Sequence, residues 1–188
     1  MTNGSNTTPN NTLLVFFSRA GENLWNDGTR TLEKGNTHRL AEMIAERIEC
    51  DVYEIVPAEP YTEDFATVDA VSAKEMRDGA RPTIAGEVPN VDKYDRIIVG
   101  SPVWHAELPM IMHTFFEATG GLSGKEVYPF VTFTGGSGAA FSVVENACPE
   151  ANVHQGLGVR GEDVVDSVED VEENLDAWVA IEYRGEDI

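Results

Sequence analysis

The sequence predicts an α/β protein in which helices cover both faces of one parallel β-sheet. Short apolar runs rich in β-branched and aromatic residues recur along the chain, and longer segments of helical periodicity separate them. Parallel neighbouring strands need crossover connections, which are usually helices. The chain has 188 residues, which suits one domain with a sizeable core. We therefore expect five strand–helix alternations in a single domain over residues 13–188.

The expected strands are short and are bounded by polar or turn-forming residues. They cover residues 13–17, 52–56, 96–100, 127–133 and 153–159. The first twelve residues, MTNGSNTTPNNT, are polar and turn-forming, so residues 1–12 are expected to be a flexible tail. This tail lacks the apolar stretch of a secretion signal, and no later run is long enough to span a bilayer. A cytoplasmic protein is expected.

The expected helices follow the strands in order. The clearest covers residues 37–48, where Leu40, Ile44 and Ile48 recur every fourth residue and predict a face that packs on the sheet. Further helices are expected at residues 63–78, 108–118, 139–147 and 163–181. In the last of these, one apolar stripe is expected to contain Val165, Val168, Val171, Leu175 and Trp178.

The charge of the chain limits its partners. The net charge is −20 and only 13 residues are Lys or Arg, so clustered cations that grip a phosphate backbone are not expected. We expect neither a nucleic-acid nor a membrane partner. Two interpretations of the acidic surface remain open: it keeps the protein soluble, or it docks a basic protein. The two cysteines are far apart and outside any Cys/His cluster, so no metal site is expected.

Three loops that follow expected strands contain the candidate binding residues. In doubly wound sheets, ligands bind beyond the carboxyl ends of the strands, where the strand order reverses. The three loops cover residues 18–37, 101–105 and 134–138. We expect them to converge on one site.

The first loop has the properties of an anion site that is divided in the sequence. Ser18, Arg19 and Ala20 end the first strand, and Asn36 and Thr37 open a helix only after the intervening segment 22–34. Asn36 is a good N-cap, and the free N–H groups of a first helical turn favour a phosphate. The Lys-Ser or Lys-Thr of a nucleoside triphosphate loop is absent, so a single terminal phosphate fits better. The alternative is a capped helix that binds nothing.

The other two loops offer a flat ring and accessible backbone. Trp104 follows Pro102 and can stack on a planar ligand, although a structural role is the alternative. In the third loop, glycines leave the backbone N–H and C=O groups accessible to a heteroaromatic edge. Its residues are Thr134, Gly135, Gly136, Ser137 and Gly138.

These segments together resemble the flavodoxin family, in particular its short-chain branch with an insertion between the two halves of the phosphate site. The resemblance covers residues 13–160 through FFSRAGEN-x-W, EKGNTHRLAEMIAE, VPAEPYTEDF, ARPTIAG, YDRIIVGSPVW-x-x-ELPM, and LSGK followed by PFVTFTGGSG. It implies a flavodoxin-like three-layer α/β/α fold whose five-stranded parallel sheet has the order 2-1-3-4-5. It also implies non-covalent FMN, with residues 22–34 looping out of the site.

The resemblance also assigns roles to individual residues. Ser18, Arg19, Ala20, Asn36 and Thr37 would hold the 5′-phosphate. Pro102, Val103, Trp104 and His105 would line the isoalloxazine, and Thr134 to Gly138 would contact its pyrimidine edge and the ribityl chain. Similar proteins commonly have a second aromatic residue at the position of His105. The histidine is a departure that changes the stacking on that side.

The implied function is a low-potential electron carrier between redox proteins, with basic partner surfaces docking on the acidic chain. One alternative is an FMN-dependent NAD(P)H:quinone-type oxidoreductase, although the sequence has no second G-x-G-x-x-G unit for a nicotinamide. A more distant alternative is a serine hydrolase. Ser137 lies in an approximate G-x-S-x-G elbow, with His105, His113 and His154 available, but Ala139 replaces the last glycine.

Overall fold

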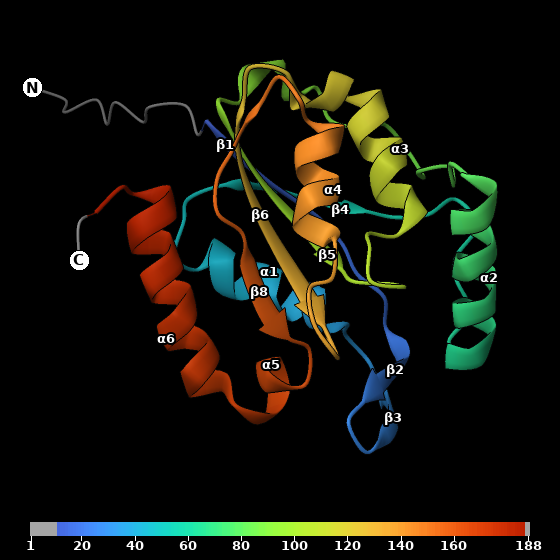
Figure 1. Cartoon of the computed structure of the whole chain (residues 1–188). Coiled ribbons are helices and arrows are strands. Elements are labelled where there is room, and N and C mark those ends of the chain that lie inside the picture. Colours follow the sequence, from blue (N-terminus) through green and yellow to red (C-terminus); the bar gives the residue numbers. More distant parts are fainter. Residues whose placement is uncertain (1–10, 187–188) are drawn as a thin grey trace, which may run out of the picture.

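A parallel sheet lies between two layers of helices in the computed structural model, which describes residues 11–186 (Figure 1). Its strands are β1 (Thr12–Phe17), β4 (Asp51–Ile55), β5 (Arg96–Pro102), β6 (Glu126–Phe133), β7 (Asn152–Val153) and β8 (Leu157–Arg160). The strand order is β4-β1-β5-β6-β7, and β8 also pairs with β6. All these pairings are parallel. The flavodoxin-like order 2-1-3-4-5 is therefore confirmed.

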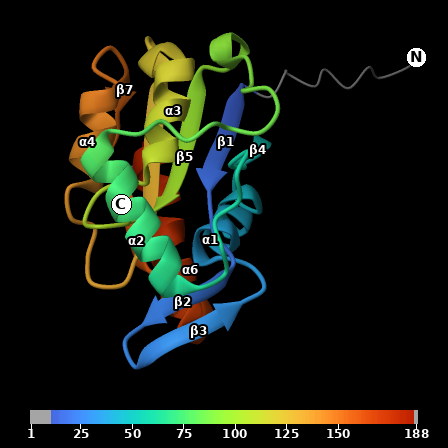
Figure 2. The ribbon, with the colours of Figure 1, turned by 90° about the vertical axis from the view of Figure 1, so that its right-hand side faces the viewer.

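Helices cover both faces of the sheet. They are α1 (Asn36–Ala45), α2 (Phe65–Asp78), α3 (Met110–Ala118), α4 (Ala140–Ala147), α5 (Asp163–Asp166) and α6 (Val168–Trp178). Short 3₁₀ turns cover Val91–Lys93 and Gly120–Leu122, and a π-helical turn, Val179–Tyr183, follows α6. Helices α1, α5 and α6 lie on one face, and α3 and α4 on the other, with α2 beside α3 (Figures 1 and 2). In the part of the chain that the structure describes, no helix is long and apolar enough to cross a membrane.

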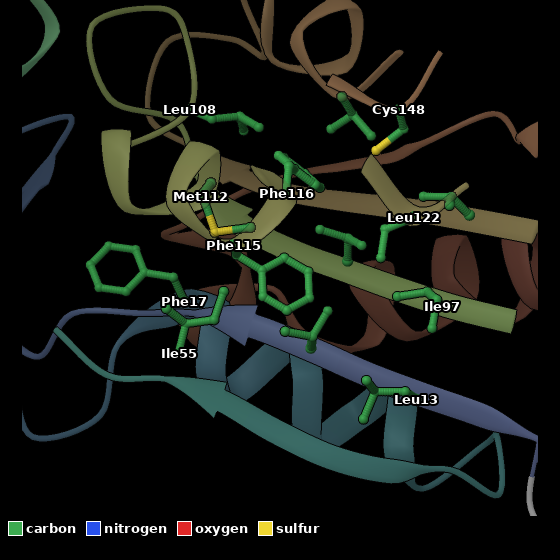
Figure 3. Close-up of a cluster of buried hydrophobic side chains, with 14 of the residues drawn as sticks. Leu13, Phe17, Ile55, Ile97, Leu108, Met112, Phe115, Phe116, Leu122 and Cys148 are labelled. Carbon is green, nitrogen blue, oxygen red and sulfur yellow. The ribbon is translucent and has the colours of Figure 1, made fainter. Parts of the chain in front are cut away.

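The alternation of side chains along β1 explains why both faces are covered. Successive side chains of a strand point to opposite faces. Leu13 and Phe17 belong to the cluster that includes Phe115 of α3, which faces them in Figure 3. Leu14 and Phe16 belong to the opposite cluster with α1 and α6. Every residue of β1 is buried, so the strand is stable only between two helical layers.

The beginning of β1 lies within the expected tail. Thr12 is buried and is the first residue of the strand, and the carbonyl of Asn11 accepts from the N–H groups of Asp95 and Arg96. Residues 1–10 of the expected tail lie outside the described residues.

The expected strand 153–159 is interrupted, so this prediction was wrong in detail. β7 ends at Val153 and β8 starts at Leu157. Between them, the carbonyl of Gln155 accepts from the indole Nε1 of Trp178 at 2.9 Å, instead of pairing with β6. A side chain of α6 therefore takes the place of a backbone hydrogen bond between strands at this point.

The expected helix 163–181 is also divided. Ser167, with φ −140° and ψ 49°, separates α5 from α6. The interruption shifts the phase of the helical repeat, so Val165 and Val168 are 39% and 42% exposed and lie outside the expected stripe. Val164 takes their place in the core, together with Val171, Leu175 and Trp178.

The inserted segment forms a β-hairpin, where the sequence indicated only a loop. Strand β2 (Gly21–Trp25) pairs antiparallel with β3 (Gly28–Leu32), outside the main sheet. The hairpin lies at the end of the molecule toward which β1 and β5 run (Figure 2). It therefore stands beside the carboxyl ends of the strands, where a ligand site is expected.

Candidate functional site

A cavity of about 530 Å³ opens at the carboxyl ends of the strands, and the three predicted loops meet there. Its size lies within the usual range for small-molecule sites. Of the predicted site residues, all except Ala20 and Ser137 line this cavity. Ala20 is exposed, and the carbonyl of Ser137 accepts from the N–H of Ala140 at the start of α4.

The phosphate cradle, defined as residues 18–20 and 35–37, has the geometry of an anion site. Gly35 is the N-cap of α1 and has no side chain to cap the helix. The hydroxyl oxygen of Ser18 does this instead by accepting from the N–H of His38 at 3.1 Å. The first N–H groups of a helix have no partner within the helix. The N–H groups of Asn36 and Thr37 are thus left at the positive end of the α1 dipole, where an anion is favoured.

The two halves of the phosphate cradle touch at Gly35. A Cβ added there would overlap the Ser18 hydroxyl and would lie 2.5 Å from the carbonyl oxygen of Arg19. Only glycine permits this approach of α1 to the end of β1. Two segments that are far apart in sequence therefore form one continuous site.

Asn36 is not the N-cap that the sequence indicated; it is the first residue of α1, after the cap Gly35. The residue is 9% exposed, and its side chain lies against Gly161. Within residues 11–186, its oxygen Oδ1 has no hydrogen-bond partner. A buried acceptor without a donor is costly, and here it belongs to a residue that lines the cavity.

Arg19 has a bracing role in the structure. Its guanidinium donates to the carbonyl oxygens of Thr62, at 3.0 Å, of Glu63, at 3.2 Å, and of Glu22. Burial lowers the pKa of Arg19, although an arginine stays charged in proteins. The side chain therefore joins the phosphate cradle to the segment that precedes α2, and its backbone remains at the cradle.

Thr37 is buried and is paired across the floor of the cavity. Its hydroxyl lies 2.7 Å from that of Thr132, the next-to-last residue of β6. Both threonines line the cavity. This contact fixes α1 relative to the end of β6.

The loop after β5 is a tight turn with an unusual backbone. Trp104 and Glu107 exchange two backbone hydrogen bonds of 2.9 and 3.0 Å, and the residues between them, His105 and Ala106, have φ values of 52° and 63°. Left-handed backbone costs a non-glycine residue about 1–2 kcal/mol. The third loop braces this turn: the N–H of Ala139 donates to the carbonyl of Ala106 at 2.7 Å, and a Cβ on Gly138 would overlap that carbonyl.

The Trp104 ring contacts the protein core as well as the cavity. It lies edge-to-face on Phe17, at a centroid distance of 5.5 Å, and on Tyr61, at 5.2 Å. Burial also raises the pKa of the Tyr61 hydroxyl, which donates to Glu75 at 2.8 Å. Trp104 is therefore fixed by protein contacts, and it also lines the cavity.

The arrangement of the histidines does not resemble that of a serine hydrolase. Among the described residues, no hydrogen bond joins Ser137 to His105, His113 or His154. His154 binds Glu126 at the opposite end of β6, with 2.6 Å between Nε2 and Oε2. His113 is in α3, where burial lowers its pKa.

Two walls of the cavity were missed by the sequence analysis. One comes from the hairpin (Asn23 and Leu24) and the other from α2. The lining residues on α2 are Phe65, Val68, Asp69 and Ser72. The other lining residues that were not predicted are Ala106, Thr132, Phe133 and Gly161, of which Gly161 follows β8. Thr132 and Phe133 directly precede the third loop, so the sequence could have indicated them. Nothing in the pattern of α2 indicated that it faces the site.

The sheet order and the strand-end cavity define a flavodoxin-like α/β protein. The chain belongs to the flavodoxin family, because the family model Flavodoxin_4, described as Flavodoxin, matches residues 32–179. Among curated proteins, no sequence matches this chain.

Several solved structures share the fold. A protein from Bacteroides eggerthii, described as a flavoprotein, is 29% identical, with a TM-score of 0.65 over 86% of this chain and 97% of its own. One from Bacteroides uniformis with the same description is 28% identical, with a TM-score of 0.64 over 85% and 98%. A flavoprotein from Lactobacillus acidophilus, solved in complex with FMN, is 22% identical, with a TM-score of 0.63 over 84% and 97%.

Proposed function

We propose that the chain binds FMN non-covalently in this cavity and carries electrons between redox proteins. The observation that supports this most strongly is the phosphate cradle, in which Gly35 brings the end of β1 against the free N–H groups at the start of α1. FMN brings a terminal phosphate for these N–H groups. The family assignment and the FMN complex of the Lactobacillus acidophilus flavoprotein agree with this choice.

The residues divide into three groups around the cofactor. The phosphate cradle would bind the phosphate, and Ser18 would donate its free hydroxyl hydrogen, because its oxygen already accepts from His38. The turn at Trp104 would bound the ring system, and the third loop would offer backbone groups to its polar edge. FMN supplies the redox chemistry, and the protein supplies binding, orientation and electrostatics.

The acidic surface supports the role of an electron carrier. Glu169, Asp170 and Glu173 are exposed on α6, and within the described residues they form no ion pair. Such charges attract a basic partner and accelerate encounter, and salt screens the attraction. We therefore propose a basic reductase and a protein acceptor as the partners.

The first test is the flavin content of the purified protein. The protein should be yellow, or become yellow on addition of FMN, and denaturation should release intact FMN. A colourless protein that does not quench FMN fluorescence would contradict the proposal.

A second function, an FMN-dependent oxidoreductase, is favoured by the apolar wall of the cavity. Leu24, which is 45% exposed, together with Phe65 and Val68 extends the cavity beyond the strand-end loops. Anaerobic stopped-flow reduction separates the two functions. A carrier is reduced slowly by NADH or NADPH alone and fast through a flavodoxin reductase, at a rate that falls with ionic strength. Rapid reduction by a nicotinamide alone, with turnover on a quinone, would show the oxidoreductase.

A further inference from the structure

His105 is held at the cavity by its backbone and by helix α2. Its φ of 52° places it in the left-handed region, and the turn at 104–107 is closed by two backbone hydrogen bonds. The side chain is 26% exposed, and its Nε2 lies 2.9 Å from the hydroxyl oxygen of Ser72. Strained positions of this kind are concentrated at functional sites. The residue lines the cavity but has no role in the core.

The hydroxyl of Ser72 determines which imidazole nitrogen bears a proton. A hydroxyl has one hydrogen to donate. That of Ser72 is directed to backbone carbonyls of its own helix, at 2.7 Å to Val68 and 3.2 Å to Asp69. With its hydrogen on these carbonyls, Ser72 accepts from His105, and Nε2 then carries a hydrogen. The carboxylate of Asp69 lies 3.8 Å from the same nitrogen.

The second nitrogen, Nδ1, is then available to a ligand. Within residues 11–186, it has no hydrogen-bond partner. The titratable side chain that contacts the ring is that of Asp69 on α2. Glu107 belongs to the same turn as His105, and the loop of residues 134–139, which braces this turn, has no titratable side chain. The carboxylate of Asp69 can pair with an imidazolium, in which Nδ1 is also a donor.

We propose that His105 is a proton-linked ligand of the flavin. The imidazolium is anchored through Nε2–H by Ser72 and Asp69, and it donates through Nδ1–H to an acceptor atom of the isoalloxazine or the ribityl chain. This inference rests on the proposed binding of FMN.

The sign of the pH effect follows from the proton count. Because the bound form contains the imidazolium, flavin affinity should fall as the pH rises through the range in which imidazoles lose a proton. The phosphate of FMN gains negative charge in the same range, which has the opposite effect on affinity. Riboflavin lacks the phosphate, so it reports on His105 alone.

The experiment measures the Kd of riboflavin by fluorescence quenching from about pH 5.5 to 8, the range in which imidazoles titrate. For the wild type, the Kd should rise about threefold to tenfold, since the contact is charge-assisted but partly exposed. The rise should disappear in His105→Gln and become smaller in Asp69→Asn. The matched control is His154→Gln, which removes a histidine–carboxylate pair at the other end of β6 and should keep the full rise.

A second measurement does not depend on variants. Binding of riboflavin should move the NMR titration midpoint of the His105 imidazole to higher pH. A riboflavin Kd that does not change with pH, a rise that persists in His105→Gln, or an unmoved midpoint would overturn the inference while leaving FMN binding intact. If neither FMN nor riboflavin binds at any pH, the proposed function fails and the inference with it.

Discussion

At the scale of single residues, the two hydroxyls of the phosphate cradle differ in the hydrogen bonds that they already form. The Ser18 oxygen accepts from His38, and within the described residues its hydrogen has no acceptor. The Thr37 hydroxyl is buried and already bonded to Thr132. A change at Thr37 would leave Thr132 without its partner and so would alter folding as well as binding. Ser18 is therefore the cleaner probe of the phosphate.

We expect Ser18→Ala to weaken FMN binding by about 1–3 kcal/mol, the range for a hydrogen bond to a charged group. Riboflavin should bind nearly as before, because it has no phosphate. Fluorescence titration with both ligands measures the difference. Ser123→Ala is the control, since Ser123 bonds Glu150 and does not line the cavity. Equal weakening of FMN and riboflavin would show that Ser18 acts through folding.

A second prediction at this scale concerns Trp104, which contacts both the core and the cavity. Trp104→Ala should lower the free energy of unfolding of the apoprotein by about 2–4 kcal/mol. This range overlaps the lower part of the usual cost for a buried aromatic residue, because Trp104 is only partly buried. The reason is the lost packing on Phe17 and Tyr61. Urea unfolding of the apoprotein measures it, with Trp104→Phe as the conservative control. Unchanged apoprotein stability with lost flavin binding would make Trp104 a cofactor contact only.

Single residues were predictable where the signal was local. The position of Ser18, Asn36 and Thr37 at the cavity could be predicted, because the end of a strand and the start of a helix are visible in the sequence. The N-cap assignment failed because Ser18, distant in sequence, accepts the N–H that a cap would take. The contact of Ser72 with His105 depends on how α2 crosses the cavity, and no sequence spacing encodes that.

At the scale of elements, the inserted hairpin is docked on α5. The buried Trp25 donates through Nε1 to Asp166 at 3.1 Å, and Arg30 binds the same carboxylate at 3.1 Å while covering the Trp25 ring. At the tip, Asn26 donates to the carboxylate of Glu162. The hairpin thus joins the two halves of the phosphate cradle and is held at its own far end.

We expect Asp166→Ala to release the hairpin without unfolding the molecule. Two hydrogen bonds to a charged group are lost, which should destabilise the hairpin locally by about 1–3 kcal/mol. Amide hydrogen exchange should then become faster over residues 21–32. Asp163→Ala is the matched control on the same helix, since within residues 11–186 no side-chain hydrogen bond or ion pair joins Asp163 to the hairpin. Identical exchange in the two variants would contradict the docking role of Asp166.

The class and order of the main elements were predictable from periodicity, but three details were not. The hairpin has few apolar residues, so its strands gave no alternation. The break at Ser167 is one non-helical residue within an otherwise helical pattern. The interruption at Gln155 depends on a tertiary contact, since the Trp178 indole takes a carbonyl that the strand would have used. Local propensity cannot report such contacts.

At the scale of the whole molecule, the net charge of −20 acts against compactness. With 33 acidic and 13 basic residues, most carboxylates have no cation available. Self-repulsion of this kind destabilises the folded state, and exposed ion pairs compensate little.

Added potassium chloride should therefore stabilise the apoprotein. Screening of the repulsion should raise the free energy of unfolding by about 1 kcal/mol or more, or roughly 2–4 °C in Tm for a chain of this size. Thermal melting over a salt series measures the effect, with sucrose of equal osmolality as the uncharged control. A Tm that falls with salt, or that rises no more than in sucrose, would contradict electrostatic destabilisation.

The most direct test of the split phosphate cradle is a fluorescence titration of the apoprotein with FMN and with riboflavin under identical conditions. If residues 18–20 and 35–37 form one phosphate site, FMN fluorescence is quenched to an endpoint of one equivalent. FMN should also bind at least about tenfold more tightly than riboflavin, because each charge-assisted hydrogen bond to the phosphate contributes about 1.5–3 kcal/mol. Absence of FMN quenching, or equal affinity for the two ligands, would contradict the account.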